Sequence, residues 1–185
     1  MKFSPMHRIV SALAISMAFV GCSEKAAEPP LVDGSSPVAT AEVPSTANPV
    51  VAGGAVQEYV PSAAISEGGH CFLDAVNGGP TKGATAQVDK EVSFGGWVSD
   101  TDNRVPTTAL FVLEGSSNSY SVPLVAGGER PDVAAALSNE ALQNSGYNVV
   151  AQLDGVAPGE YALAIVLGSD QVVRCELNAK LTVDI

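Results

Sequence analysis

From residue 70 to the end of the chain, short runs of alternating apolar and polar residues recur between turns rich in Gly, Pro, Asn and Asp. Alternation with period two is typical of half-buried β-strands. In the run 91–99, Val92, Phe94 and Val98 share one face, and the Gly95-Gly96 pair predicts a bulge or a close backbone approach. Comparable patterns predict further strands over residues 71–76, 108–113, 120–124, 147–153, 161–167, 172–177 and 181–185.

Short strands at this spacing favour a two-sheet antiparallel sandwich over a parallel α/β fold. One segment, 131–137, has a different pattern. Pro131 suits the first turn of a helix, Asp132 follows it, and a run of three alanines, 134–136, comes after Val133. We therefore predict an all-β domain over residues 67–185, with one or two helical turns as a crossover between its sheets.

Residues 23–66 show neither a helical nor an alternating period, and six prolines are scattered among small residues there. Small side chains bury little apolar area, so such a segment cannot offset the entropy lost on ordering. The composition predicts a flexible tether. A spacer whose length matters is favoured over a specific partner-binding motif.

The N-terminus carries two basic residues and then an uncharged run, 9–20. That run is too short to cross a hydrocarbon core of ~30 Å at ~1.5 Å per residue, which favours a removed signal peptide over a transmembrane helix. The following sequence, Phe19-Val20-Gly21-Cys22, resembles the lipobox of bacterial lipoproteins. Met6 is an alternative start.

The lipobox resemblance implies a signal peptide over residues 1–21, a lipid on Cys22 and a tether over the rest of 22–66. It also implies a cell-envelope location. Ser23 follows the cysteine, where an Asp is the usual inner-membrane retention signal of Gram-negative lipoproteins. By the same resemblance, we expect the outer membrane.

The negative net charge of the chain disfavours some classes of binding partner. All 20 Asp and Glu residues follow Cys22, so removal of Lys2 and Arg8 with the leader changes the formal charge from −11 to −13. Such a chain is repelled by phosphate backbones and anionic head groups, and it has no basic cluster to overcome that repulsion. We expect no nucleic-acid partner, and we expect membrane attachment through the lipid alone.

Cysteine usage fits this compartment. With Cys22 lipidated, Cys71 and Cys175 remain as an even pair in an oxidising environment, which favours a disulfide between an early and a late strand. A redox centre would need a C-x-x-C arrangement, and a zinc site would need more ligands than His70 and two thiols.

Four segments occur in an order that resembles immunoglobulin-like β-sandwich modules appended to bacterial cell-envelope and surface-polysaccharide proteins. They are Gly96-Trp97-Val98-Ser99-Asp100, Arg130-Pro131-Asp132-Val133-Ala134, Asn144-Ser145-Gly146-Tyr147 and Pro158-Gly159-Glu160-Tyr161. The resemblance spans about residues 71–183. It implies an accessory module without catalytic residues, here standing alone on a lipid anchor.

Catalytic motifs are lacking in the sequence. His70 is the one histidine after Cys22, and the chain has no Gly-x-Ser-x-Gly, His-Glu-x-x-His or phosphate-binding Gly-x-x-x-x-Gly-Lys motif. We interpret His70, which directly precedes Cys71 in a predicted strand, as a structural residue or a residue at the rim of the domain. Asp89 and Glu91, two residues apart, could form a glycosidase pair, but acidic strand ends are commoner. We expect neither an enzyme nor a cofactor.

A run of oxygen-bearing side chains at 100–103 suggests a second alternative. Asp100, Asp102 and Asn103 could begin a calcium loop, but Arg104 occupies the next alternating ligand position and no distal Glu completes the spacing. An Asx-type turn is favoured, and we expect no metal site.

Candidate ligand-surface residues are Trp97, Tyr120, Arg130 and Tyr147. Trp97 fits either a core position in a sandwich or a platform that stacks on a sugar ring, which the two tyrosines could join. Arg130 could recognise an anionic group or pair with a neighbouring acid. The sequence thus favours a lipid-anchored module that binds an envelope glycan or protein. A structural subunit without a ligand is the alternative, and an enzyme is the least favoured class.

Overall fold

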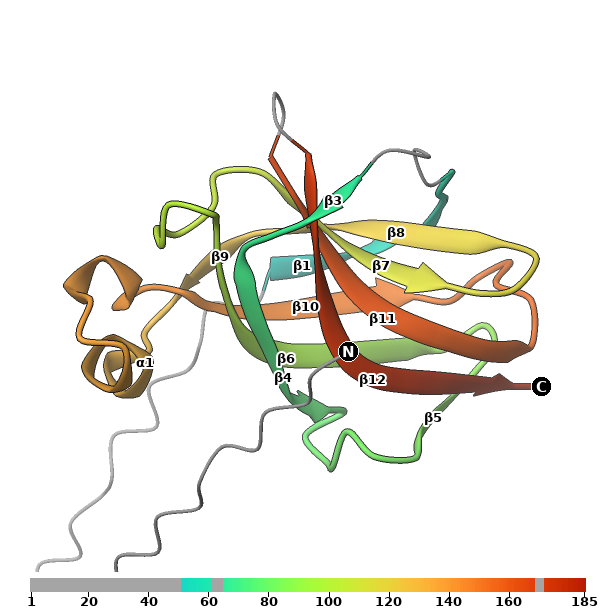
Figure 1. The fold of residues 1–185 in the computed structure, drawn as a ribbon. Coiled ribbons are helices and arrows are strands. Elements are labelled where there is room, and N and C mark those ends of the chain that lie inside the picture. Colours follow the sequence, from blue (N-terminus) through green and yellow to red (C-terminus); the bar gives the residue numbers. More distant parts are fainter. Residues whose placement is uncertain (1–50, 61–64, 169–171) are drawn as a thin grey trace, which may run out of the picture. The chain divides into compact units, whose positions relative to one another are not determined.

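The computed structural model describes residues 51–60, 65–168 and 172–185 (Figure 1). The expected signal peptide, Cys22 and the tether up to residue 50 lie outside these residues. Two β-sheets make up most of the fold. The first sheet has the strand order β1 (Val51–Ala55), β10 (Gly146–Gln152), β6 (Glu91–Ser99) and β4 (His70–Val76), and β9 (Ala126–Gly128) also pairs with β10.

The second sheet runs through β2 (Gln57–Glu58), β8 (Ser119–Leu124), β7 (Ala109–Glu114), β11 (Gly159–Leu167), β12 (Val173–Asp184) and β3 (Ser66–Glu67), and β5 (Ala84–Gln87) also pairs with β12. Between β9 and β10 lie helix α1 (Pro131–Ala136) and a 3₁₀ turn, η1 (Glu140–Leu142). These two short helices stand at one end of the sheets (Figure 1).

The core lies between the two sheets, where alternate residues of each strand point inward. Phe94 of β6 stacks on Phe111 of β7, with ring centroids 4.3 Å apart, and both rings are fully buried. Leu113 and Ile165 of the second sheet are equally buried in the same cluster. The predicted all-β sandwich is confirmed at this level.

Several predicted elements have nearly the expected bounds. β6 covers 91–99, and α1 occupies the segment expected to be helical. The helix is not the predicted crossover between sheets, because it connects β9 to β10, which pair with each other in the first sheet. At the C-terminus, one strand replaces the two predicted ones. Asn178 adopts a left-handed conformation with a φ of 50°, and a register shift opposite Leu163 absorbs the irregularity, so β12 continues to Asp184.

Strand pairing begins earlier than the sequence predicts. Residues 51–58, assigned above to the tether, form what we call the N-terminal strap. Its β1 pairs in parallel with β10, and β2 pairs antiparallel with β8. Between them, the Val56 amide donates to the Gln152 carbonyl at 3.3 Å. The strap therefore contacts both sheets, which differs from the tether expected here.

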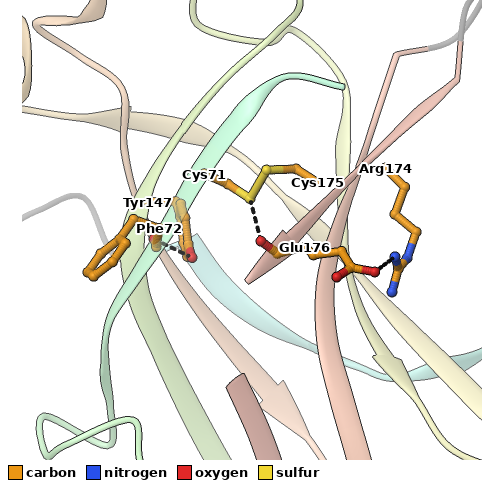
Figure 2. Close-up of a disulfide and its surroundings, with 6 residues drawn as sticks. All are labelled: Cys71, Phe72, Tyr147, Arg174, Cys175 and Glu176. Atoms are coloured by element: carbon orange, nitrogen blue, oxygen red, sulfur yellow. Dashed lines mark hydrogen bonds and ion pairs between the residues drawn. A yellow bond between two sulfur atoms is a disulfide. The ribbon is translucent and has the colours of Figure 1, made fainter. Parts of the chain in front are cut away.

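The disulfide is confirmed. Cys71 of β4 and Cys175 of β12 are bonded, with their Cα atoms 6.1 Å apart (Figure 2). β4 is the edge strand of the first sheet, so the bond links that edge to the second sheet. The Cys71 sulfur lies 3.7 Å from the Glu176 carbonyl oxygen. Because a disulfide sulfur carries no proton, this contact is not a hydrogen bond.

Among the described residues, no helix combines the length and apolar character needed to cross a membrane.

Candidate functional site

An aromatic pair lies on the outer face of the first sheet. Phe72 of β4 and Trp97 of β6 are register partners, and their neighbours Leu73 and Val98 point into the core. Phe72 is 56% exposed and Trp97 is half-buried. On its other side, Trp97 pairs with Gly146, which has no side chain to cover the indole. Of the two sequence interpretations of Trp97, the geometry excludes the core position.

A cavity of about 280 Å³ opens beside this pair. Three of its lining residues are apolar and three carry uncharged amide groups or an imidazole: Trp97, Leu137, Leu142, His70, Asn103 and Asn139. They come from β4, β6, the turn after β6, and the α1–η1 segment. We call this cavity together with Phe72 the aromatic platform. Leu137, 49% exposed, forms part of its rim.

Asn139 holds two of these segments together. Its side-chain Oδ1 accepts a hydrogen bond from the Ala141 amide at 3.1 Å and so caps η1. Its Nδ2 donates to the Asn103 carbonyl at 2.7 Å. The α1–η1 segment is thereby fastened to the turn after β6, which fixes one wall of the cavity.

The turn itself is organised by Asp100. One carboxylate oxygen accepts hydrogen bonds from the backbone amides of Asp102 and Arg104, both at 2.9 Å. This is the Asx-type geometry favoured from the sequence. In residues 51–60, 65–168 and 172–185, no group of three or more His, Cys, Asp or Glu side chains could hold a metal ion.

Arg130 lies on the same face as Trp97. Its Nε and Nη2 donate to the Asp132 carboxylate at 2.9 and 2.8 Å, and its Nη1 donates to Asp74 at 2.7 Å. Gly146 makes this possible, because a Cβ there would lie 3.0 Å from the Arg130 Cγ. The hydrogen bonds from Arg130 lower the pKa of Asp132 to about 2.

Of the two roles considered for Arg130, the pairing role with Asp132 is the one observed. The Arg130 side chain is only 16% exposed, and its guanidinium bonds to two carboxylates, so it has little capacity left for an anionic ligand. The Arg130–Asp74 bond runs from the segment before α1 to the bulge in β4. Arg130 therefore holds the segment before α1 against β4 at one side of the platform.

The two tyrosines lie elsewhere. Tyr147 is 1% exposed, and its hydroxyl donates to the Phe72 carbonyl at 3.1 Å (Figure 2). Burial raises the pKa of Tyr147. Tyr120 packs edge-on against Tyr161, and its hydroxyl accepts from the Ala157 amide at 3.3 Å. Of the four expected surface residues, only Trp97 and Arg130 share a face.

Asp89 and Glu91, considered above as a glycosidase pair and interpreted as acidic strand ends, lie on different parts of the backbone. Asp89 stands in a turn with a φ of 58° before β6 begins, whereas Glu91 starts the strand and accepts a hydrogen bond from Gln152 at 3.3 Å. The two do not share one strand face.

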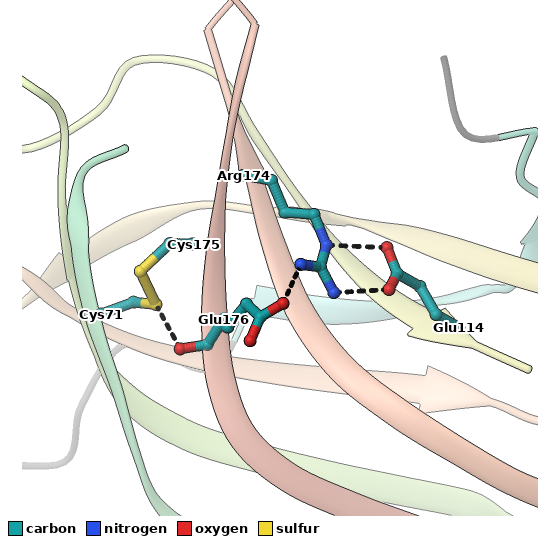
Figure 3. A network of polar contacts seen from close by, with 5 residues as sticks. All are labelled: Cys71, Glu114, Arg174, Cys175 and Glu176. Carbon is teal, nitrogen blue, oxygen red and sulfur yellow. Dashed lines mark hydrogen bonds and ion pairs between the residues drawn. A yellow bond between two sulfur atoms is a disulfide. The ribbon is translucent and has the colours of Figure 1, made fainter. Parts of the chain in front are cut away.

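A second charged cluster involves β12. The Arg174 guanidinium donates two parallel hydrogen bonds to Glu114, at 2.9 and 2.6 Å, and also pairs with Glu176 (Figure 3). These bonds raise the pKa of Arg174. The network joins β7 to β12 across β11. Because its guanidinium and carboxylate groups already bond to one another, it has fewer hydrogen-bonding groups available to a ligand than the platform has.

Sequence reasoning missed Phe72, Leu137, Asn139 and Leu142. Phe72 had a signal, because it is an aromatic residue at an outward position of an alternating run. The others come from segments far from Trp97 in sequence, and only the fold brings them together.

No protein-family model matches the chain, and a search of curated proteins finds no significant match.

Proposed function

We propose that the chain is a non-catalytic binding module of the bacterial cell envelope, held at the outer membrane through a lipid on Cys22. The lipobox-like segment, the acidic charge and the cysteine pattern support this location. The disulfide agrees with an oxidising compartment, where such bonds persist.

We further propose that the sandwich is of the immunoglobulin-like type. In support, β4, β6 and β10 form one sheet, and β8, β7, β11 and β12 follow in order in the other. The Tyr161 hydroxyl, near the start of β11, donates to the Ala157 carbonyl at 2.6 Å, as in the tyrosine corner of such folds. The chain departs from antibody domains in its disulfide, which joins β4 to β12.

The ligand surface in this proposal is the aromatic platform. The observation that carries it is the pair of exposed Phe72 and half-buried Trp97 beside a preformed cavity. Large apolar side chains exposed next to one another are characteristic of interaction sites. The proposed ligand is an envelope glycan or protein that covers this face.

Affinity capture from solubilised envelopes tests the proposal. The oxidised full chain would serve as bait, and both sugars and proteins retained would be identified. Trp97→Ala should abolish capture, whereas Val60→Ala, at an exposed apolar position outside the platform, should leave it intact. Retention that is unaffected by Trp97→Ala would contradict the platform and favour a structural subunit that uses another surface.

The anchor has its own test. Cells fed labelled palmitate should label the wild-type chain and fail to label Cys22→Ser. Equal labelling of the two would overturn the lipid attachment.

A further inference from the structure

We infer that the cavity of the aromatic platform binds one uncharged sugar ring, stacked against Trp97. This inference rests on the proposed binding function and deepens it by naming the ligand class. It starts from the chemistry of the cavity lining, which contains no carboxylate, ammonium or guanidinium group.

The lining matches the two kinds of surface on a pyranose. Trp97 and Leu137 supply apolar contact for the C–H face of a ring, whereas Leu142 lines the cavity but is only 1% exposed. His70, Asn103 and Asn139 supply groups that can pair with hydroxyls. A side-chain amide both donates and accepts, as a sugar hydroxyl does, so amides suit neighbouring hydroxyl groups.

Part of this hydrogen-bonding capacity is not used within the fold. One N–H of the Asn139 side-chain amide donates to the Asn103 carbonyl, and its oxygen accepts from the Ala141 amide. The second N–H of this amide takes part in neither bond and can donate to a ligand. Asn103 takes part in that bond through its main-chain carbonyl, so its side-chain amide is not consumed by it.

The size of the cavity limits what can enter. Its volume of about 280 Å³ lies just below the ~300–1,000 Å³ typical of sites for drug-sized ligands. It has room for one ring with its substituents. A longer glycan would have to continue outside, and Phe72, the register partner of Trp97, offers a second aromatic surface there.

The surrounding charge selects against anionic sugars. Three carboxylates lie in the segments that supply the two asparagines: Asp100 and Asp102 in the turn with Asn103, and Glu140 next to Asn139. The same two segments contain one cationic side chain, Arg104. Arg130 is already paired with two carboxylates. The whole chain carries −11, so carboxylated or phosphorylated sugars are repelled at both short and long range.

Calorimetric titration of the oxidised full chain with neutral N-acetylglucosamine oligomers and with carboxylated hyaluronan oligomers tests the inference. The neutral oligomers should bind, and the carboxylated ones should bind at least tenfold more weakly. The intrinsic fluorescence gives a second readout, because Trp97 is the sole tryptophan of the chain.

Three variants locate the site. Asn103→Gly removes the amide but tolerates the φ of 57° at this position, and it should weaken neutral-sugar binding several-fold. Trp97→Ala should abolish binding, and Trp97→Phe, which keeps a ring in case the alanine variant fails to fold, should weaken it. Val60→Ala should bind as the wild type does.

Equal or tighter binding of the carboxylated oligomers would overturn the inference, as would neutral binding unaffected by Trp97→Phe and Asn103→Gly. If no sugar binds but a protein is captured in a Trp97-dependent manner, the sugar inference fails and the proposed binding function stands. If nothing binds in a Trp97-dependent manner, both fail.

Discussion

The hydroxyl of Tyr147 occupies the space in which a side chain at Gly96 would begin. A Cβ on Gly96 would lie 2.6 Å from the Tyr147 hydroxyl oxygen and 2.0 Å from the Phe72 carbonyl oxygen. The hydrogen bond from Tyr147 to Phe72 runs through that same space. Thus a glycine in β6 allows an aromatic residue of β10 to reach the backbone of β4, beneath the aromatic platform.

Gly96→Ala should therefore be strongly destabilising. The added methyl group cannot fit without moving two strands, and overpacking of this kind costs about 1–3 kcal/mol or more. Urea unfolding of the oxidised chain measures the loss. Gly95→Ala is the matched control, since a Cβ there meets nothing within 4 Å, and its stability should change little or rise. Equal losses in both variants would contradict this packing.

Tyr147→Phe should weaken the dependence of stability on alkaline pH. Burial raises the pKa of Tyr147 above its ordinary value of 10.0, so the unfolded chain loses this proton first. The stabilisation is complete below about pH 10 and is lost as the pH rises further, at ~1.4 kcal/mol per pH unit for one such group.

Urea unfolding of wild type and Tyr147→Phe between pH 8 and 11 measures both slopes. The phenylalanine variant starts lower, since it lacks the bond to Phe72, but should fall less steeply. Parallel slopes would show that Tyr147 does not carry the effect.

Loss of the disulfide should lower stability considerably. The bond spans a sequence separation of 104, for which the chain-entropy estimate is ~4.7 kcal/mol, and native disulfides of small domains typically contribute ~2–5 kcal/mol. Thermal unfolding of Cys71→Ala/Cys175→Ala should show the lower Tm. Reductant should lower the Tm of the wild type and leave that of the double variant unchanged. A wild type indifferent to reductant would contradict the prediction.

Arg130→Gln should return the pKa of Asp132 from about 2 toward its ordinary value of 3.8, because the guanidinium bonds to this carboxylate are lost. The stabilisation from this pair is present above pH 3.8 and disappears as the pH falls through about 2. Carboxyl NMR titration follows Asp132 directly. Arg104→Gln, which removes a charge elsewhere, should leave the Asp132 titration unchanged, and a similar shift in both variants would argue against the specific pair.

The elements that the sequence predicted well were those whose signal is local. Alternation of Val92, Phe94 and Val98 located β6, and Pro131 located the helix start. Alternation also grouped Tyr147 with Val149 on one face of β10, and that face is the core. The same pattern could have excluded Tyr147 from the ligand surface.

What could not be predicted depends on partners distant in sequence. The N-terminal strap has no alternation of its own, and its strands form because β10 and β8 offer edges for pairing. The cavity likewise requires the turn after β6 and the α1–η1 segment to meet, a contact fixed by Asn139 and Asn103. The sequence of the turn after β6 gives no indication that the α1–η1 segment lies against it, and the reverse is also true.

The disulfide also decides how the molecule would bear tension. If the chain is held at its N-terminus while the C-terminus is pulled, the load between the strap and Ile185 passes from Cys71 directly to Cys175. Every strand from β5 to β11 lies in the bypassed loop and cannot be drawn out while the bond is intact. Only the chain before Cys71 and the chain beyond Cys175 can lengthen, so every residue that lines the cavity except His70 lies in the part protected from mechanical unfolding along this path.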